Sequence, residues 1–430
     1  MNEKDESDMN KGLDEGKTPQ ELRRENEQRM MDCIHLNPVD RIPVGCELGF
    51  FNAKYCGIPC SAAYYDFDGW LAACRTVLED FRPDIAGIRP FAPGKALEYL
   101  DPKVMLWPGH GSDAVCGEMQ TIEVDSLGED EYDLFLKSPA DYMLRKHLPR
   151  LHGGLQVLSL LPELDNTLWI EPWAGESIAM WVTQPEVEAA LQNLLEAGRE
   201  MRKWIPRMHE FDDLLAEFGI PSGAQGGVLP PFDMVSHSVR GMKGTMLDMF
   251  RQPDKLLELC EYVLGKSLER PTPPPNEYGN TRMFMTNTRG SDNFLSNKQF
   301  EKFYWPHAKK LLLTLIERGM TPCMFFEGNF DLKLEYLLEL PRASMLVRLD
   351  RTDIFRAKEI LGDHLCLEGN VPASLLQMGS VQEVKDYCKK LIDVVGAGGG
   401  YILSPRSSTN QSKPENLKAM IDFTKEYGRY

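Results

Sequence analysis

Polar residues stand at the carboxyl ends of several short apolar segments, and Glu327 is the most direct candidate for chemistry among them. It interrupts the apolar run PCMFFE and is followed by Gly328 and Asn329, a turn in which the backbone can approach a ligand closely. A carboxylate in this position can serve as a metal ligand or a general base. It can equally hold a loop or pair with an arginine, so both interpretations stay open.

Other candidates occupy comparable positions after apolar segments. Arg289 and Asp292 flank Gly290 and could hold an anionic group or pair with each other. His237, in DMVSHSVRG, stands where a general acid or a metal ligand would be placed, although a single histidine can also be structural. We take Glu327, Asp292 and His237 as the catalytic candidates.

A wider set of residues at segment ends is expected to bind substrate. Asp350 belongs to it, although the same residue could simply cap the helix that follows. The set is Glu47, Arg89, Asn287, Arg289, Asn329, Asp350, Asn370 and Arg406. If the segments are parallel strands, these side chains gather at one edge of the sheet, where binding sites form.

Eight apolar segments precede these residues and predict eight strands. They cover residues 42–47, 84–89, 223–228, 282–287, 322–327, 345–350, 364–369 and 400–404. Amphipathic stretches that predict helices follow the later segments, at residues 297–318, 353–361, 381–395 and 413–427. Alternating strands and helices are typical of a parallel sheet, and eight units favour a closed (β/α)8 TIM barrel over an open sheet.

The alternation breaks between about residues 91 and 221, where turn signals, the acidic run GEDEYD and long polar helices replace it. This pattern predicts a large insertion after the second strand, which would cover the pocket or build a subunit contact. Residues 1–18 have almost nothing to bury and predict a disordered acidic tail. A helix should begin at Thr18-Pro19, and residues 19–430 should form a single domain.

Composition excludes several classes of protein. The chain has 430 residues, of which 42% are hydrophobic and 26% charged, as in ordinary globular proteins. Its net charge of -17 repels nucleic acid and anionic lipid. The sequence has neither a long apolar span nor a signal-peptide pattern at its N-terminus. We therefore expect a cytoplasmic protein with a small-molecule substrate and no nucleic-acid or membrane partner.

The ten cysteines predict reduced, buried thiols, because they are too dilute for a disulfide scaffold and lie mostly inside apolar runs. Cys56 and Cys60 form the one close pair. Their three-residue gap falls within zinc-knuckle spacing, but no second CxxC or HxxxH pattern follows, so free thiols are favoured over a zinc site.

Four segments resemble the uroporphyrinogen decarboxylase superfamily, which includes the decarboxylase and the methyltransferases that act on corrinoid proteins. They are NPVDRIPV, FLSNKQFEKFYWPHAKKLL, TDIFRAKEILGDHLCLEGNVPASLLQMGSVQEVKDYCKKLI and GGYILSPRSSTNQSKPENLKAMIDFTKEYG. The resemblance implies a (β/α)8 barrel, in agreement with the eight segments counted from the residues. It also implies an enzyme.

The decarboxylase's own substrate-binding residues are missing. That enzyme carries an arginine-rich loop, MRQAGR, after its first strand, whereas this chain has CELGFF at residues 46–51. It also carries an aspartate in an FSD segment after its second strand, and the matching residues 88–93, IRPFAP, contain no acid. An acidic protein without the arginine loop is poorly suited to a substrate with eight carboxylates.

The zinc ligands of the thiol-directed methyltransferases are also missing. Those enzymes bind zinc through an HxCG segment on strand five and a cysteine in SPGC after strand eight. The corresponding residues here are Phe325, Glu327 and Ser407. The usual His and Cys ligands are therefore absent, although Glu327 could belong to an oxygen-rich metal site. The branch that demethylates aromatic methyl ethers fits this change.

The leading hypothesis is a corrinoid-dependent methyltransferase. It would move a methyl group from a small substrate, such as an aryl methyl ether, to cobalamin carried by a partner corrinoid protein. The alternative is a carboxy-lyase, similar to the decarboxylase, acting on a smaller carboxylate held by arginines such as Arg89, Arg289, Arg351 and Arg406. A third interpretation is a tetrapyrrole- or corrinoid-binding protein. Some members of the superfamily form dimers, so a homodimer is expected here too.

Overall fold

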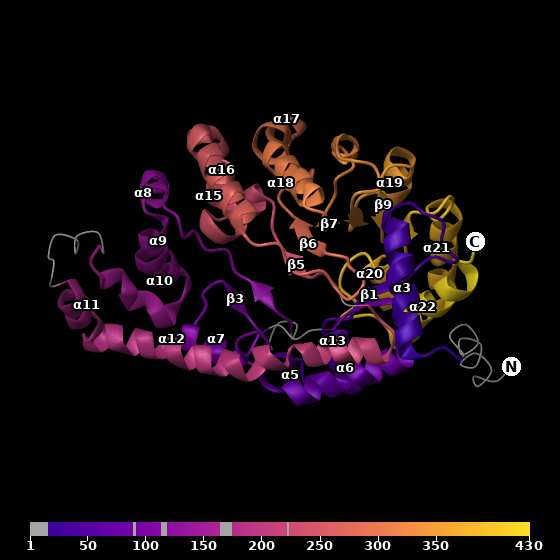
Figure 1. Cartoon of the computed structure of the whole chain (residues 1–430), viewed down its shortest axis with the longest axis horizontal. Coiled ribbons are helices and arrows are strands. Elements are labelled where there is room, and N and C mark those ends of the chain that lie inside the picture. The colour runs from indigo at the N-terminus through magenta and orange to yellow at the C-terminus, as the bar shows by residue number, and fades with distance from the viewer. Residues whose placement is uncertain (1–15, 89–91, 113–117, 164–173, 222) are drawn as a thin grey trace.

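Eight parallel strands follow one another along the chain in the computed structural model, which describes residues 16–88, 92–112, 118–163, 174–221 and 223–430 (Figure 1). They are β1 (Gly45–Glu47), β2 (Ile85–Gly87), β5 (Gly226–Gly227), β6 (Arg282–Asn287), β7 (Thr321–Phe326), β8 (Leu346–Leu349), β9 (Cys366–Glu368) and β10 (Tyr401–Ile402). Each lies within or overlaps one of the eight predicted segments. The apolar runs therefore located the strands correctly.

The strands are arranged in chain order around a barrel. Strands β5 to β10 form one parallel sheet, and β1 pairs with β2 in parallel. A parallel bridge between Val44 and Leu403 joins the β1 side to the β10 side. The order of paired strands thus runs from β5 through β10 and β1 to β2. Among the described residues, these two outermost strands, β2 and β5, do not pair with each other. The predicted (β/α)8 barrel is confirmed.

Helices follow the strands and cover the outside of the barrel. The principal ones are α3 (Pro19–Ile34), α6 (Phe67–Phe81), α16 (Pro253–Glu269), α18 (Trp305–Glu317), α19 (Ile354–Leu361), α21 (Val381–Val394) and α22 (Pro414–Tyr427). Thr18 forms a capping box with Glu21 at the start of α3. The cap of α19 is Asp353, which accepts hydrogen bonds from the backbone nitrogens of Phe355 and Arg356. The suggestion that Asp350 caps this helix is wrong.

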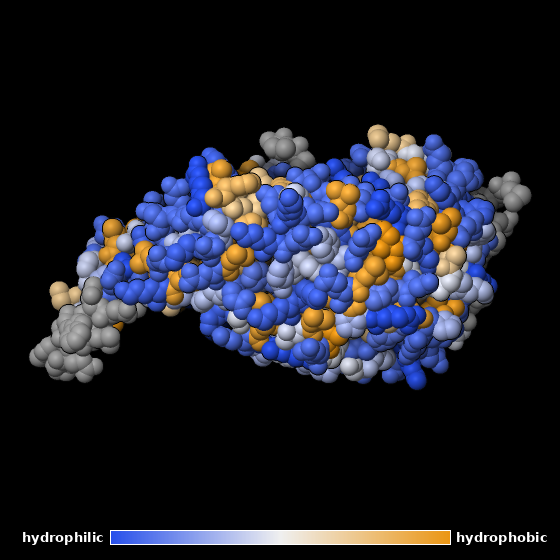
Figure 2. Space-filling view, turned by 90° about the horizontal axis from the view of Figure 1, so that it is seen from above, coloured by the Kyte–Doolittle hydropathy of each residue, from blue (hydrophilic) through white to orange (hydrophobic). Residues whose placement is uncertain are grey.

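The insertion after strand β2 is mainly helical. It includes α7 (Gly94–Leu100), α8 (Tyr132–Lys137), α10 (Leu148–Leu151), α11 (Ala174–Val182), α12 (Pro185–Trp204) and α13 (His209–Glu217), and the small antiparallel pair β3 (Met105–Leu106) and β4 (Gln120–Thr121). Helices α10, α11 and the first part of α12 extend away from the barrel as an arm (Figure 1). The same arm projects from the rounded body in the view from above (Figure 2). The predicted tail at residues 1–18 lies almost wholly outside the described residues.

Helix α3 closes the bottom of the barrel. Its residues Met30, Met31, Cys33 and Ile34 pack against Leu346, Cys366 and Ile402 at the amino ends of three strands. Beside them, Arg282 and Glu27 form a buried ion pair of 2.5 Å. The closed bottom leaves the carboxyl ends of the strands as the accessible end of the barrel. In the part of the chain that the structure describes, no helix is long and apolar enough to cross a bilayer.

Candidate active site

A layer of four side chains from adjacent strands lies on the inner face of the barrel. Successive residues of a strand point to opposite faces, and the neighbours Met283, Met285, Met324 and Phe326 are buried on the outer face under the helices. The strand register pairs Thr286 with Phe325, Phe325 with Arg348, and Arg348 with Glu368. We call Thr286, Phe325, Arg348 and Glu368 the axial layer.

Arg348 is the centre of charge in the axial layer. Its guanidinium lies 5.1 Å from the ring centroid of Phe325, and its Nε lies 3.5 Å from Oε1 of Glu368. Its Nη1 lies 3.6 Å from Oε1 of Glu47, on β1 across the barrel. Burial raises the pKa of Glu368, and the nearby Arg348 opposes that rise. One cation is thus shared by two carboxylates.

The Nε–H group of Arg348 is buried and makes no hydrogen bond within the described part of the chain. A buried donor without a partner costs free energy, and such groups often mark a ligand site. Neither residue was predicted from the sequence, because Arg348 lies inside β8, and Glu368, which ends β9, lies one residue before the end of the predicted segment 364–369. The available signal was a charged residue inside each of the apolar runs MLVRLD and HLCLEG.

Phe284 adds an accessible aromatic ring to the inner face. It precedes Thr286 by two residues on β6 and therefore lies on the same face, nearer the bottom of the barrel. Its exposed fraction is 44%, whereas Met283 and Met285 beside it are buried. A large apolar side chain that is accessible inside a barrel offers a contact surface for an apolar ligand.

Glu327 lies at the rim, directly above Phe325 on β7. Its side chain is exposed, and the hydroxyl of Thr288 donates a hydrogen bond of 3.3 Å to its Oε2. It makes no ion pair with any residue that the structure describes, so the suggested arginine partner is not observed. Glu47, 58% exposed, also reaches the inside of the barrel, through its contact with Arg348.

A buried carboxylate, Asp233, holds the loop after β6. It accepts hydrogen bonds from the backbone nitrogens of Thr288 and Arg289, at 3.1 and 2.8 Å, and from the hydroxyl of Tyr304. Burial raises the pKa of Asp233 to about 6. His237 Nε2 lies 3.8 Å from the same carboxylate. Asp233 was not predicted from the sequence, because it lies in the short helix Pro231–Met234 after β5 and not at a strand end.

Arg289 connects this loop to the insertion. Its guanidinium bonds to the carboxylate of Glu123, to the hydroxyl of Ser236 at 3.1 Å, and lies 3.5 Å from His237 Nδ1. Burial, assisted by the charge of Arg289, lowers the pKa of His237. His237 is therefore a neutral imidazole beside a cation at pH 7, and Arg289 already has a carboxylate partner.

Asp292 and Asn329 form loop contacts beside the rim. Asp292 makes a 2.5 Å ion pair with Lys333, and both side chains are largely buried. The backbone nitrogen of Asp292 donates to the carbonyl of Asn329, and the Asn329 side chain accepts from Asp331. The suggestion that Asp292 pairs with Arg289 is wrong, because Arg289 pairs with Glu123.

The other residues predicted to bind substrate lie in different places, some at the rim of the barrel and some within the sheet. Asp350 accepts a hydrogen bond from the Gly328 nitrogen, and burial raises its pKa while Arg406 nearby lowers it. Asn370 donates to the carbonyls of Asp350 and Thr352. Asn287 is buried behind β6, where it accepts from Gly290, so it does not face the inside of the barrel. Arg89 lies outside the described residues.

The second half of the chain is similar to a known family. Residues 221–427 match the family model described as uroporphyrinogen decarboxylase. The match contains strands β5 to β10. Over the whole chain, the structure resembles a methyltransferase from Methanosarcina mazei, with a TM-score of 0.57 and 15% identity, covering 94% of this chain and 98% of that one. No curated protein matches the chain.

The positions that correspond to the zinc ligands of the thiol-directed methyltransferases do not form a metal site among the described residues. Phe325 stacks against the Arg348 guanidinium, and Glu327 has Thr288 as its side-chain partner. Among the described residues, no group of three or more His, Cys, Asp or Glu side chains lies close enough to hold a metal. The side chains present do not fit zinc, so the assignment of Glu327 as a metal ligand gains no support.

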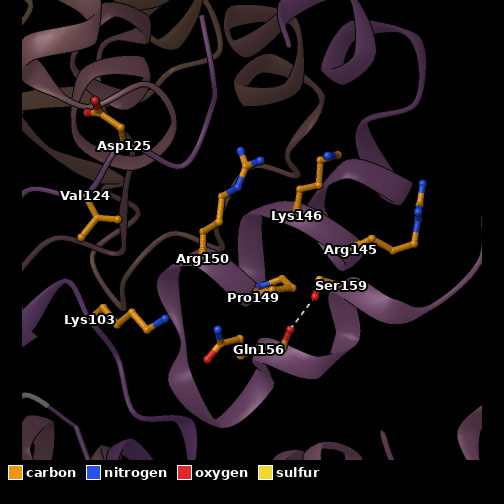
Figure 3. Close-up of a pocket in the computed structure, with 9 residues that line it drawn as sticks. All are labelled: Lys103, Val124, Asp125, Arg145, Lys146, Pro149, Arg150, Gln156 and Ser159. Atoms are coloured by element: carbon orange, nitrogen blue, oxygen red, sulfur yellow. Dashed lines mark hydrogen bonds between the residues drawn. The ribbon is translucent and has the colours of Figure 1, made fainter. Parts of the chain in front are cut away.

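A hollow lies in the insertion, away from the axial layer. Its volume is about 470 Å³, and its lining includes Lys103, Arg145, Lys146 and Arg150 (Figure 3). Asp141 bonds to Arg145 at 2.6 and 2.7 Å, and Glu131 bonds to Arg150 at 2.5 and 2.9 Å. The basic side chains do not converge on one point (Figure 3). Carboxylates already neutralise both arginines, so the hollow is a poor anion site.

Proposed function

We propose that this protein is a methyltransferase that moves a methyl group from a small methylated donor, bound inside the barrel, to a corrinoid on a separate protein. The observation that carries the proposal is the axial layer. Aromatic rings of Phe284 and Phe325 lie on its face, and its one cation, Arg348, is shared by Glu47 and Glu368. The structural likeness to a methyltransferase is consistent with it.

The charges of the site favour a neutral or weakly charged donor. Arg348 and Arg289 are the arginines held at the inner face and at the loop after β6, and each already faces a carboxylate. A substrate with many carboxylates would have to displace those partners and would meet the charge of Glu327. A flat, apolar donor, such as an aryl methyl ether, would instead contact the rings of Phe284 and Phe325.

The transfer breaks the bond between the methyl carbon and the ether oxygen and forms a bond between that carbon and cobalt, the nucleophile. The electron pair of the broken bond stays on oxygen, which must gain a proton or a strong hydrogen bond. Burial raises the pKa of Glu368, so its protonated form, which would be the proton donor, persists to a higher pH than that of an exposed glutamate. The Nε–H of Arg348, which faces Glu368 at 3.5 Å but makes no hydrogen bond within the described residues, can donate to the same oxygen.

The direct test combines the purified protein with a corrinoid protein reduced to Co(I) and a panel of aryl methyl ethers. Methylation of the corrinoid is followed by its absorbance. We expect methyl transfer from at least one ether, and a fall in kcat/KM of about a hundredfold or more in Arg348→Ala. Arg24→Ala, an exposed arginine on α3, is the matched control and should leave the rate unchanged. Absence of transfer across the panel would contradict the proposal.

One observation favours the carboxy-lyase as a second candidate. The Nε of Arg406 is buried and has no hydrogen-bond partner within the described residues, so it could hold a single carboxylate. Release of carbon dioxide from small carboxylates in the absence of corrinoid, lost in Arg406→Ala, would support the lyase and argue against methyl transfer.

A further inference from the structure

Gly227 on β5 occupies a position on the inner face of the barrel, beside the ring of Phe284. The strand register pairs Gly227 with Phe284 on β6, and residues paired between neighbouring parallel strands lie on the same face of the sheet. The preceding residue, Gly226, faces the other way. A Cβ added to Gly226 would lie 2.8 Å from Pro273 and 3.1 Å from the sulfur of Met283, which is on the outer face. Gly227 therefore faces the inside.

No described side chain fills the space in front of Gly227. Apart from its chain neighbours, a Cβ added to Gly227 would come within 4 Å of one described atom, the backbone oxygen of Phe284 at 3.5 Å. Gly227 is exposed although it lies in a strand of the barrel, and the ring of Phe284 beside it is 44% exposed. The interior of a (β/α)8 barrel is normally filled by large side chains. The space beside Phe284 therefore has room for a ligand.

Neither the backbone nor the packing of the protein requires glycine at position 227. The φ angle of Gly227 lies outside the left-handed region that favours glycine. Gly226 differs, because a larger side chain there would collide with Pro273. A glycine inside a strand weakens the strand, whereas β-branched residues favour it. A glycine that is not needed for the fold indicates a position where a ligand approaches the backbone closely.

The ion pair of the axial layer lies toward the opposite side of the barrel. Arg348 on β8 contacts Glu47 on β1, with β9 and β10 on one side of this contact and β2, β5, β6 and β7 on the other. The wider part of the interior is therefore on the side of β5 and β6. Phe284 lies two residues below Thr286 of the axial layer, about 7 Å along the strand. An aromatic ring beside Phe284 would hold its ether oxygen near the level of Arg348.

We infer that Gly227 determines the size of the donor, because the ring of an aryl methyl ether occupies the space that the missing side chain leaves beside Phe284. The inference rests on the proposed function and specifies the place of the ring within the same site. A side chain at position 227 would exclude the ring. A small alkyl donor would not need this space, so the same side chain would leave its binding unchanged.

Binding to the full chain without corrinoid tests the place of the ring separately from the reaction. Isothermal titration calorimetry measures the Kd of methoxybenzene for the wild type, Gly227→Ala and Gly227→Val. We expect the Kd to rise with the size of the side chain, by at least about tenfold in Gly227→Val. Gly265→Val, at an exposed glycine on α16 where an added Cβ meets no described atom, is the matched control and should leave the Kd unchanged. Thermal unfolding should show that Gly227→Val is at least as stable as the wild type.

Methyl transfer to a Co(I) corrinoid protein then separates this inference from the proposed function. Gly227→Val should raise KM for methoxybenzene by at least about tenfold and leave KM for dimethyl ether unchanged. Methoxybenzene that does not bind to the wild type, or that binds equally well to Gly227→Val, would overturn the inference, as would an equal loss with both donors. Binding that Gly227→Val weakens, without methyl transfer from any ether, would support the place of the ring and contradict the proposed reaction.

Discussion

Arg348 Nη1 lies 3.6 Å from Oε1 of Glu47, although strands β9 and β10 separate their own strands β8 and β1 around the barrel. This ion pair therefore crosses the inside of the barrel. Glu368 approaches the same guanidinium from β9. The contact forms a charged layer between the rim and Phe284, so a ligand that enters from the rim meets this layer before it reaches the ring of Phe284.

Glu368 should give methyl transfer a dependence on pH. Burial raises the pKa of Glu368, so its carboxyl stays protonated to a higher pH than that of an exposed glutamate. If this proton goes to the leaving oxygen, kcat should fall as pH rises through the raised pKa. Glu368→Gln should lower kcat by about a hundredfold and lose that pH dependence. Steady-state rates at a series of pH values check this, and an unchanged pH profile in the variant would contradict it.

Asp233 should make the folded state less stable above about pH 6. Its pKa is raised to about 6 by burial, whereas an unfolded aspartate titrates near 4. Between these values the unfolded chain loses the proton first, so the free energy of unfolding falls as pH rises, by up to about 3 kcal/mol. Asp233→Asn keeps the hydrogen-bonding shape and should remove this contribution. Urea unfolding of both proteins at pH 4 and pH 7 measures the difference, and equal pH dependence would contradict the prediction.

The ion pair between Asp292 and Lys333 should matter for stability more than for chemistry. Both side chains are largely buried, so Asp292→Ala leaves an unpaired buried charge and should cost about 3 to 5 kcal/mol of unfolding free energy. Replacing both residues, as Asp292→Ala with Lys333→Met, should recover much of that loss. Thermal unfolding gives the comparison. If Asp292→Ala unfolds like the wild type but loses activity, Asp292 has a catalytic role instead.

The sequence was sufficient to predict the barrel because the apolar strands and the caps of the helices are local signals. Thr18 and Pro19, for example, begin α3 as expected. Predicting the site also requires knowing on which side of its strand each residue lies, because only residues on the inner side can contact a ligand in the barrel. Asn287 ends β6 but points outward, whereas Thr286 and Thr288 point inward. Predicting the site from strand ends alone therefore selected Asn287 and passed over Phe284.

Two other residues show why contacts in the site cannot be predicted from the positions of strand ends in the sequence. Arg348 gains its importance from Glu47 and Glu368, which are far apart in the sequence and meet only when the barrel closes. Asp233 takes its place from the backbone nitrogens of the loop after β6 and the hydroxyl of Tyr304, from which it accepts hydrogen bonds. Neither partnership leaves a pattern of spacing in the sequence.

Phe284 should determine the affinity for an aryl donor. Its ring is 44% exposed on the inner face of the barrel and is available to contact an aromatic substrate. An aromatic contact contributes about 1 kcal/mol, so Phe284→Ala should raise KM for an aryl methyl ether by about five- to tenfold while kcat changes little. Steady-state kinetics with an aryl donor and a small alkyl donor separate the two effects, because the alkyl donor cannot stack. Phe250→Ala, an exposed phenylalanine on α15 (Met242–Arg251), is the matched control. An equal loss with both donors would mean that Phe284 supports the strand and does not contact the substrate.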